Sequence, residues 1–527
     1  MRPKTEESRG LDGYVARGSE GPIEGRTRRT GQREGTCATA QDVPLVLVTL
    51  LLLSTVACAR LDESEDGYVD DAGTRADAGA QLEPGAAASK SGGPWFDHAD
   101  ALARRYPVFG VTLNHMVYIY EGPRKDARPV GYLRRGARFR AGEEVGRNGC
   151  VRGWFEIAGG GYVCAGEGIS VDSEPPAYLD PPVLPVLSDA LPYRYTKVVA
   201  AELAQFVRLP SPEEERAATT TLTGLKLNAA GVPVVDPVAA QLAALVRLRM
   251  QPGFYVSVDR TVEAENNRSF VRTVRGGMVR AEHLADSKQP AGLGVSLGSQ
   301  YTLPLAFVYR AGAPSLRLDP LTKEPVKAGG DLPLHSAHSL TGESMVKAGR
   351  RYLVTRAGLL LRDGSVRVID RVPRPRQTPR SERWIRVDLD RQTLTAYESE
   401  TPVFATLISS GLPDHATPTG IFRLHAKHVT TTMADDMAAD GPYSIEDVPW
   451  TMYFQGGYAL HAAFWHDRFG NQRSHGCVNL APRDARWLFF WTLPELPSAW
   501  HGVLAGVGQG TTVVLDTGVS YALEQGG

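Results

Sequence analysis

The chain has 527 residues, of which 42% are hydrophobic and 22% are charged. Its 58 basic and 59 acidic residues leave a formal net charge of −1, which argues against a nucleic-acid-binding protein, because such proteins usually carry a concentrated basic face. A chain of this length is long enough for about three domains, each with its own hydrophobic core.

Residues 1–58 predict an export signal. The hydrophobic run 43–57 is too short for a membrane-spanning helix of roughly 20 residues but suits a signal-peptide core. Cys58 follows the run in a setting that resembles a lipoprotein processing site, which predicts a lipid anchor and a place on the periplasmic side of the cell envelope. Cleavage by an ordinary signal peptidase and a buried core element are the alternatives. Residues 59–94, rich in acidic residues, Ala and Gly, predict a disordered linker.

Residues 95–172 predict a small β-barrel. Short apolar stretches at 116–120, 128–133, 137–140 and 153–157 are separated by Gly, Pro and charged turns. Their order resembles the bacterial Src-homology-type barrels of envelope enzymes, with Trp154 in the place of the hairpin aromatic. Cys150 and Cys164 suit two strands of one hairpin, and export would permit a disulfide between them; two unpaired buried thiols are the alternative.

Residues 175–380 are the least readable part of the chain. The stretches 196–207 and 239–248 predict amphipathic helices, and a β-rich stretch follows from 254. This α+β region is compatible with a second, divergent barrel, and its sequence assigns it no function. Residues 373–379, rich in Pro and Arg, predict a linker into a last domain at 381–517. The protein is therefore expected to be mainly β and multi-domain.

The last domain contains Cys477 within catalytic reach of histidines. A thiol is a poor nucleophile until it ionises, and a neighbouring imidazolium or a helix N-terminus lowers its pKa. His461 closes the strand-like run 453–460, and Pro482 is a good first residue for a helix. Both an imidazole and a helix N-terminus are therefore expected near the cysteine. A single Cys is usually a small buried hydrophobe. Its Gly, His, Ser and Asn flanks, however, do not build an apolar core.

A zinc site is the other alternative for these residues. His461, His466, His475 and Cys477 supply N and S ligands, but their spacing matches no common structural-zinc signature. We therefore expect neither a metal nor another cofactor.

The segment 474–479, Ser-His-Gly-Cys-Val-Asn, resembles the Ser/Thr-His-Gly-Cys-hydrophobic-Arg/Asn motif of the L,D-transpeptidases, cysteine enzymes that cross-link bacterial peptidoglycan. The family's upstream His-Gly is matched at His461, with Ala462 in place of the Gly. The segments 407–411 and 417–422 resemble the family's strand-Ser-Thr/Ser-Gly and Thr-Pro-x-Gly-x-Phe signatures. Strands predicted at 384–390, 393–397 and 511–515 complete the resemblance.

The resemblance implies a β-rich catalytic domain that acts on peptidoglycan stem peptides. Cys477 would be the nucleophile and His461 the base. Residues Ser474, His475, Gly476 and Asn479 would shape the site and bind the donor. Backbone N–H groups around Gly476 and Cys477 would stabilise the oxyanion.

Three alternatives stay open at this point. His466, five residues beyond His461, is the competing base. An L,D-carboxypeptidase on the same fold, with water in place of the acceptor amine, would share the chemistry up to the thioester. A non-catalytic protein that binds the cell wall is the third alternative.

Overall fold

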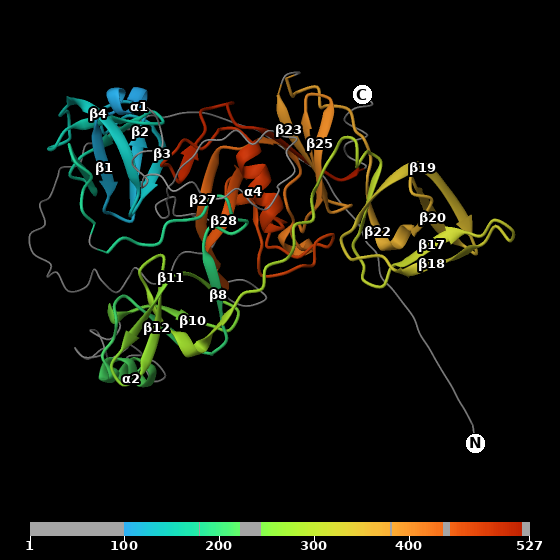
Figure 1. The fold of residues 1–527 in the computed structure, drawn as a ribbon, viewed down its shortest axis with the longest axis horizontal. Helices are drawn as coiled ribbons and strands as arrows, with labels where there is room; N and C mark the ends of the chain where they lie inside the picture. Colours follow the sequence, from blue (N-terminus) through green and yellow to red (C-terminus); the bar gives the residue numbers. More distant parts are fainter. Residues whose placement is uncertain (1–99, 179, 222–243, 380–381, 436–442, 519–527) are drawn as a thin grey trace, which may run out of the picture. The chain divides into compact units, whose positions relative to one another are not determined.

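The computed structural model of the protein describes residues 100–178, 180–221, 244–379, 382–435 and 443–518 (Figure 1). The expected signal, Cys58 and the acidic linker lie outside the described residues. Within those ranges the protein is mainly β and contains several sheets, as the sequence predicts. None of the helices in the described ranges is long and apolar enough to cross a membrane.

The first module contains one short helix and seven strands. The helix is α1 (Asp100–Arg105), and the strands are β1 (Val108–Thr112), β2 (Met116–Tyr120), β3 (Pro129–Arg134), β4 (Arg138–Gly146), β5 (Trp154–Ile157), β6 (Tyr162–Cys164) and β7 (Ile169–Asp172). They pair in the antiparallel order β7-β1-β4-β5-β6-β2-β3. Apolar side chains from alternate positions fill the interior of the module, as the period of half-buried strands requires.

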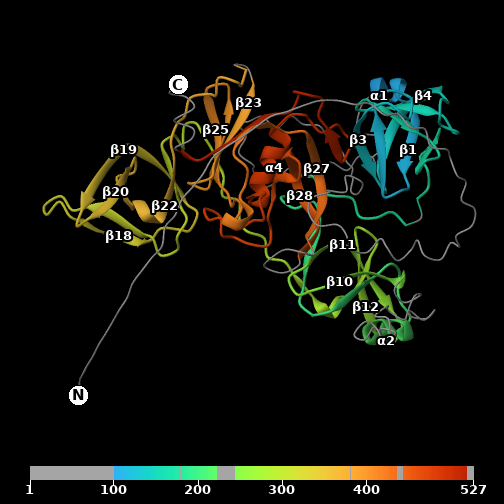
Figure 2. The same ribbon diagram turned by 180° about the vertical axis from the view of Figure 1, so that it is seen from behind.

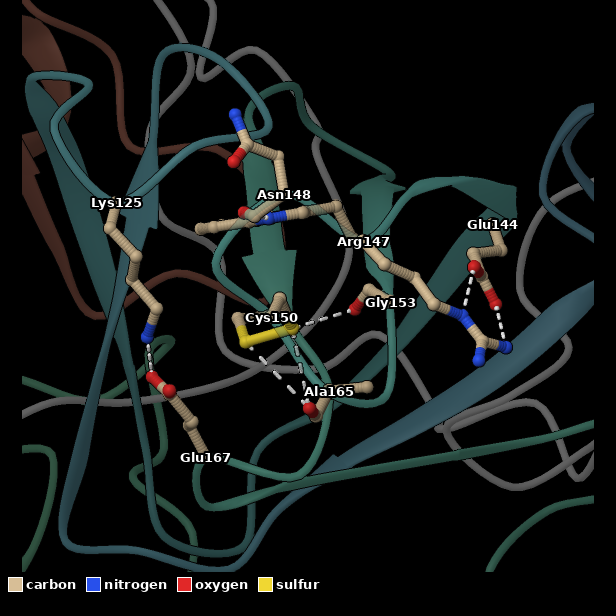
Figure 3. The surroundings of a disulfide bond; sticks show 10 residues. Lys125, Glu144, Arg147, Asn148, Cys150, Gly153, Ala165 and Glu167 are labelled. Carbon is tan, nitrogen blue, oxygen red and sulfur yellow. Dashed lines mark hydrogen bonds and ion pairs between the residues drawn. A yellow bond between two sulfur atoms is a disulfide. The ribbon is translucent and has the colours of Figure 1, made fainter.

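A disulfide joins the turn before β5 to the end of β6 in this module. Cys150 and Cys164 are bonded, with 5.7 Å between their Cα atoms. Figure 3 shows the disulfide at Cys150 together with the ion pairs Lys125–Glu167 and Arg147–Glu144. Trp154 lies against the disulfide and is fully buried, and Tyr120 meets its ring edge-on at 5.6 Å. Trp154 is therefore a core residue of the module.

The second and third modules repeat the first. The second has β8 (Arg194–Val198), β9 (Leu203–Phe206), α2 (Pro212–Thr221), β10 (Val246–Met250), β11 (Tyr255–Ala264), β12 (Arg268–Thr273), β13 (Met278–Arg280), η1 (Ala281–His283) and β14 (Leu284–Asp286). The third has β16 (Leu305–Val308), β17 (Pro314–Leu318), β18 (Pro325–Asp331), β19 (Ala337–Lys347), β20 (Arg350–Thr355), β21 (Leu360–Arg362), η2 (Asp363–Ser365) and β22 (Val366–Ile369).

All three modules share one strand order. The second reads β14-β8-β11-β12-β13-β9-β10 and the third reads β22-β16-β19-β20-β21-β17-β18, each the counterpart of the order in the first. In the second and third modules a 3₁₀ turn precedes the last strand. The region that the sequence left unassigned is therefore two further copies of the first module's topology.

The helix predicted at 196–207 is wrong. This segment forms β8 and β9, separated by a turn in which Glu202 has φ +53°. Tyr195, Thr196 and Val198 are aromatic or β-branched, and such side chains pack well on a pleated surface. Of the helix predicted at 239–248, the described residues 244 and 245 are helical, whereas the prediction is wrong for residues 246–248, because they belong to strand β10 (Val246–Met250).

The C-terminal domain contains two sheets and a helix. Its strands are β23 (Arg383–Asp388), β24 (Thr393–Glu398), β25 (Thr401–Leu407), β26 (Gly420–Arg423), β27 (Ala426–Asp435), β28 (Tyr443–Gln455), β29 (Tyr458–Ala462), β30 (Val478–Leu480), β31 (Gly502–Leu504) and β32 (Thr512–Asp516). One sheet has the order β15-β25-β24-β23-β32-β26, in which β15 (Val295–Ser296) precedes the third module in the chain. The other continues from β27 through β28 and β29 to β30.

Helix α4 (Pro482–Trp491) packs on β28 and β29 (Figure 2). Its first residue is Pro482, whose missing N–H needs no partner in the first turn. Beyond its other end, the buried ammonium of Lys427 in β27 donates hydrogen bonds to the carbonyls of Thr492 and Pro494, each at 2.8 Å. A third bond, to the carbonyl of Phe489 at 2.5 Å, satisfies a group in the last turn that the end of a helix leaves without an intrahelical partner.

Asp447 in β28 connects a sheet of the C-terminal domain to two of the modules. Its carboxylate accepts hydrogen bonds from Arg134 of β3 at 3.0 Å, from Thr430 of β27 at 3.1 Å, and from Ser257 of β11. Its backbone carbonyl accepts a hydrogen bond from the Tyr195 hydroxyl at 2.6 Å. Removing one member of such a buried, paired network leaves an uncompensated charge. This buried carboxylate thus contacts both modules and the hairpin β27–β28, and it is one of several links between them, such as the bond from Gln205 to Glu446 at 2.7 Å.

Candidate active site

The parallel pairing of β29 and β30 brings the predicted catalytic residues together. Their register places Leu460 opposite Val478 and His461 opposite Asn479. Leu460 and Val478 belong to the main hydrophobic core. Because side chains alternate between the faces of a strand, His461 and Asn479 lie on the other face, and Cys477 lies two residues before Asn479 on that same face.

His461 is oriented as a base. Its side chain is 2% exposed, and Nδ1 lies 3.0 Å from the carbonyl oxygen of Ala462. A carbonyl only accepts, so Nδ1 carries the ring proton and Nε2 keeps its lone pair. The indole of Trp465 stacks on the imidazole at 5.8 Å with an interplanar angle of 25°. Because the group that accepts the Nδ1 proton is a backbone carbonyl, Ala462 provides it as well as the Gly of the family motif would.

The thiol of Cys477 and the imidazole of His461 are a pair of neutral groups at physiological pH. Burial raises the pKa of Cys477 to about 11 and lowers the pKa of His461 to about 4. The expected lowering of the thiol pKa is not found, because strand β30 separates Cys477 from the start of α4 and the imidazole of His461 is uncharged at neutral pH. The sulfur instead lies 3.7 Å from the carbonyl of Gly457.

The loop before Cys477 is fixed by internal hydrogen bonds. The Ser474 hydroxyl donates to the carbonyl of Cys477 and accepts from the N–H of Gly476 at 3.1 Å. Thr417 Oγ1 donates to the Gly476 carbonyl at 2.7 Å and accepts from the N–H of Gly411 at 2.9 Å. The Gly476 N–H, which we expected in the oxyanion hole, is thus already bonded within the loop.

Gly476 is required at its position for two reasons. Its φ is +122°, a conformation that L side chains rarely adopt, and an added Cβ would lie 2.5 Å from Cε1 of Tyr458. The same loop is tied to the strand end at 409–411 by bridges from Ser409 to Asn479 and from Gly411 to Ser474. The motif's glycine therefore sets the course of the backbone at Cys477.

His466 lies beside the pair and contacts Asn479. Its Nε2 is 3.0 Å from Nδ2 of Asn479, and its Nδ1 accepts a hydrogen bond from the N–H of Arg468 at 3.3 Å. Burial, followed by the charge of Arg473, lowers the pKa of His466 to about 3. Both ring nitrogens thus have partners other than the thiol, whereas Nε2 of His461 has none among the hydrogen bonds of the described residues.

Sequence reasoning missed several residues around the motif. The ring of His475 lies 4.9 Å from His415 and stacks on Tyr443 at 4.9 Å, with 23° between the planes. Tyr458 covers Gly476. The proximity of His415 to the 417–422 signature was a usable signal, whereas nothing in the sequence pointed to Tyr443 at the start of β28.

Two modules contact the segment that follows His461. Phe464 packs against Tyr195 at 4.3 Å and Tyr255 at 5.4 Å, both from the second module. Arg367 of the third module donates a hydrogen bond to the carbonyl of Gly470 at 2.9 Å. Nowhere in the described part of the chain do three or more His, Cys, Asp or Glu side chains gather in a way that would hold a metal ion.

Comparison with known proteins assigns the C-terminal domain. The model of the YkuD family, the L,D-transpeptidase catalytic domain, matches residues 382–515. A mutant of the Enterococcus faecium L,D-transpeptidase is 24% identical over 26% of this chain and 50% of its own, with a TM-score of 0.21. The catalytic domain of the E. faecium enzyme acylated by ertapenem is 27% identical over 26% of this chain and 100% of its own, also with a TM-score of 0.21.

An L,D-transpeptidase from Mycobacterium smegmatis is 18% identical over 44% of this chain and 95% of its own, with a TM-score of 0.21. The matched region thus spans half the length of the first E. faecium structure. The search of curated proteins finds no match. The family match and the ordered motifs around Cys477 agree on the same segment, and residues 382–515 of this chain are an L,D-transpeptidase catalytic domain of the YkuD family.

Proposed function

We propose that this protein is a peptidoglycan L,D-transpeptidase that forms cross-links through a thioester on Cys477. The observation that carries the proposal is the position of His461 and Cys477 on one strand face, with the imidazole held so that its Nε2 lone pair is free. This arrangement supplies a nucleophile and its base.

The reaction begins on a tetrapeptide stem. His461 Nε2 takes the thiol proton as Sγ of Cys477 attacks the carbonyl of the L-centre before the terminal D-residue. When the tetrahedral intermediate collapses, the C–N bond breaks, and the D-amino acid leaves with the proton from His461. The acceptor amine of a second stem then attacks the thioester, and its proton returns through His461 to the thiolate.

The residues around Cys477 and His461 bind the donor stem. Ser474 and Gly476 set the loop, and the stacked rings of His475 and Tyr443 offer a surface for the donor stem. Water in place of the acceptor amine would give an L,D-carboxypeptidase by the same acyl-enzyme. The family places the enzyme in the cell envelope.

Acylation by ertapenem tests the nucleophile. The E. faecium relative was captured as an ertapenem acyl-enzyme. We expect the full-length protein to gain one drug mass by intact mass spectrometry, because the strained amide of the drug presents a carbonyl to Cys477. Cys477→Ala should gain none, and Ser365→Ala in the third module is the matched control. An adduct that persists in Cys477→Ala would remove the thiol from the mechanism.

The pH dependence tests the neutral pair. Since the pKa of His461 is about 4 and that of Cys477 about 11, the resting pair stays neutral between these values. The kcat/KM for acylation should fall tenfold per pH unit below about 4, where the imidazole is protonated, and stay level up to neutral pH. His461→Gln should lower acylation by about 10² to 10⁴-fold.

Alkylation by iodoacetamide reports the thiolate directly, and its rate should rise until about pH 11. His338→Gln, a substitution of a histidine in β19 of the third module, is the control and should leave both profiles unchanged. A wild-type alkylation midpoint near neutral pH would contradict the neutral pair and indicate a preformed thiolate–imidazolium pair.

A lipid anchor at Cys58 completes the proposal. The short apolar run before Cys58 and the acidic linker after it would hold the catalytic domain away from a membrane surface. Wild-type protein should partition with membranes and begin at a lipid-bearing Cys58. Cys58→Ser should lose the lipid mass. Mature wild-type protein that starts elsewhere and carries no lipid would refute the anchor and leave the enzyme assignment standing.

A further inference from the structure

The amide of Asn479 has one hydrogen-bonding atom without a partner. The side chain is 3% exposed, Nδ2 lies 3.0 Å from Nε2 of His466, and Oδ1 is buried without a hydrogen bond to any residue that the structure describes. A buried polar atom without a partner is costly, and in a native protein it calls for an explanation. Oxygen and nitrogen of an amide are distinguished by their partners, so His466 decides which atom stands where.

The position of the ring proton on His466 determines how the side-chain amide of Asn479 is oriented. Nδ1 accepts from the N–H of Arg468, which has no choice but to donate, so Nδ1 carries no proton. The ring is neutral because burial holds its pKa far below the physiological range. A neutral imidazole has one N–H, which must therefore be on Nε2. That N–H needs an acceptor, and the acceptor is the amide oxygen of Asn479.

The amide nitrogen then takes the unpartnered position. Asn479 is opposite His461 in the β29–β30 register and shares the strand face of Cys477, while its neighbours Val478 and Leu480 point into the core. An N–H donor thus becomes available on the catalytic face. The Gly476 N–H is not available to an oxyanion on this face, because it donates its hydrogen bond to the Ser474 hydroxyl.

We propose that His466 is a positioning residue, which turns the amide of Asn479 so that Nδ2–H donates a hydrogen bond to the oxyanion formed on attack by Cys477. The inference rests on the proposed function for the reaction concerned. No proton moves in this step: Asn479 stabilises negative charge on the oxygen of the tetrahedral intermediate, and His461 alone exchanges protons.

Asn479→Asp is the sharpest substitution. It keeps the shape of the side chain but can only accept, so it places a carboxylate next to the developing oxyanion and draws a proton onto His466. We expect kcat and kcat/KM for acylation to fall together by about 10²- to 10³-fold, the loss typical of an oxyanion donor. Because the substitution buries a carboxylate, the melting temperature of the variant is measured and acylation is assayed below it.

Two substitutions of His466 distinguish a role in positioning the Asn479 amide from a role in packing. His466→Gln retains an N–H donor for the Asn479 oxygen and should keep part of the activity, whereas His466→Phe fills similar space without a donor and should match the loss in Asn479→Asp. His338→Phe in the third module is the control for placing Phe at a half-buried histidine. Equal activity of the Gln and Phe variants would overturn the proposal.

The tautomer of His466 is measured without any substitution. In wild-type protein labelled with ¹⁵N-histidine, the ring should show an unprotonated Nδ1 and a protonated Nε2, and it should keep this tautomer from pH 8 down to about 5. The Nδ1–H tautomer would overturn the proposal even if the variants fail to fold. If wild-type protein forms no acyl-enzyme, the proposed function fails, whereas the tautomer still decides the arrangement of His466 and Asn479.

Discussion

The active site depends on the parallel pairing of β29 with β30. This register puts His461 and Asn479 side by side and brings Cys477 to the same face, while the opposite face of both strands is sealed into the core. A shift by one residue would move the imidazole into that core and the apolar side chains into the site. The loop from Ser474 to Gly476, held by Thr417, fixes where the second strand begins.

The three modules contribute to this arrangement from outside the catalytic domain. Asp447 joins Arg134 of the first module and Ser257 of the second to the hairpin whose strand β28 begins with Tyr443. Phe464 of the segment after His461 packs on the second module, and the Gly470 carbonyl is bonded to the third. The modules are thus part of the framework of the site, because they brace the segments on either side of His466.

Local sequence was sufficient to predict the residues of the motif. Spacing and chemistry pointed to Cys477 and His461, whose catalytic roles stay predictions. Alternation predicted the strands at 384–390 and 393–397, the family resemblance predicted the strand at 511–515, and all three strands form. The run 453–460, predicted as one strand, is divided by a turn at Gly456 into the end of β28 and the start of β29. Alternation alone does not reveal a turn between two apolar stretches.

What the sequence did not reveal depends on contacts between distant residues. The raised pKa of the thiol is a consequence of burial, which motif chemistry does not report. Asp447 and Arg134 are 313 residues apart, and Tyr443 and His475 meet only in the folded chain. The repeated modules were hidden for a related reason, since their shared strand order is set by pairing between strands and not by local composition.

The central claim is that Cys477 carries the stem peptide during turnover. Acid quenching of the full-length protein in the presence of a disaccharide tetrapeptide, followed by digestion and mass spectrometry, tests it most directly. The account predicts that the peptide containing Cys477 carries a tripeptide stem as a thioester, and that the adduct disappears when an acceptor amine is added and a cross-linked dimer forms. Cross-linked product made while the stem is attached to another residue, or to none, would contradict it.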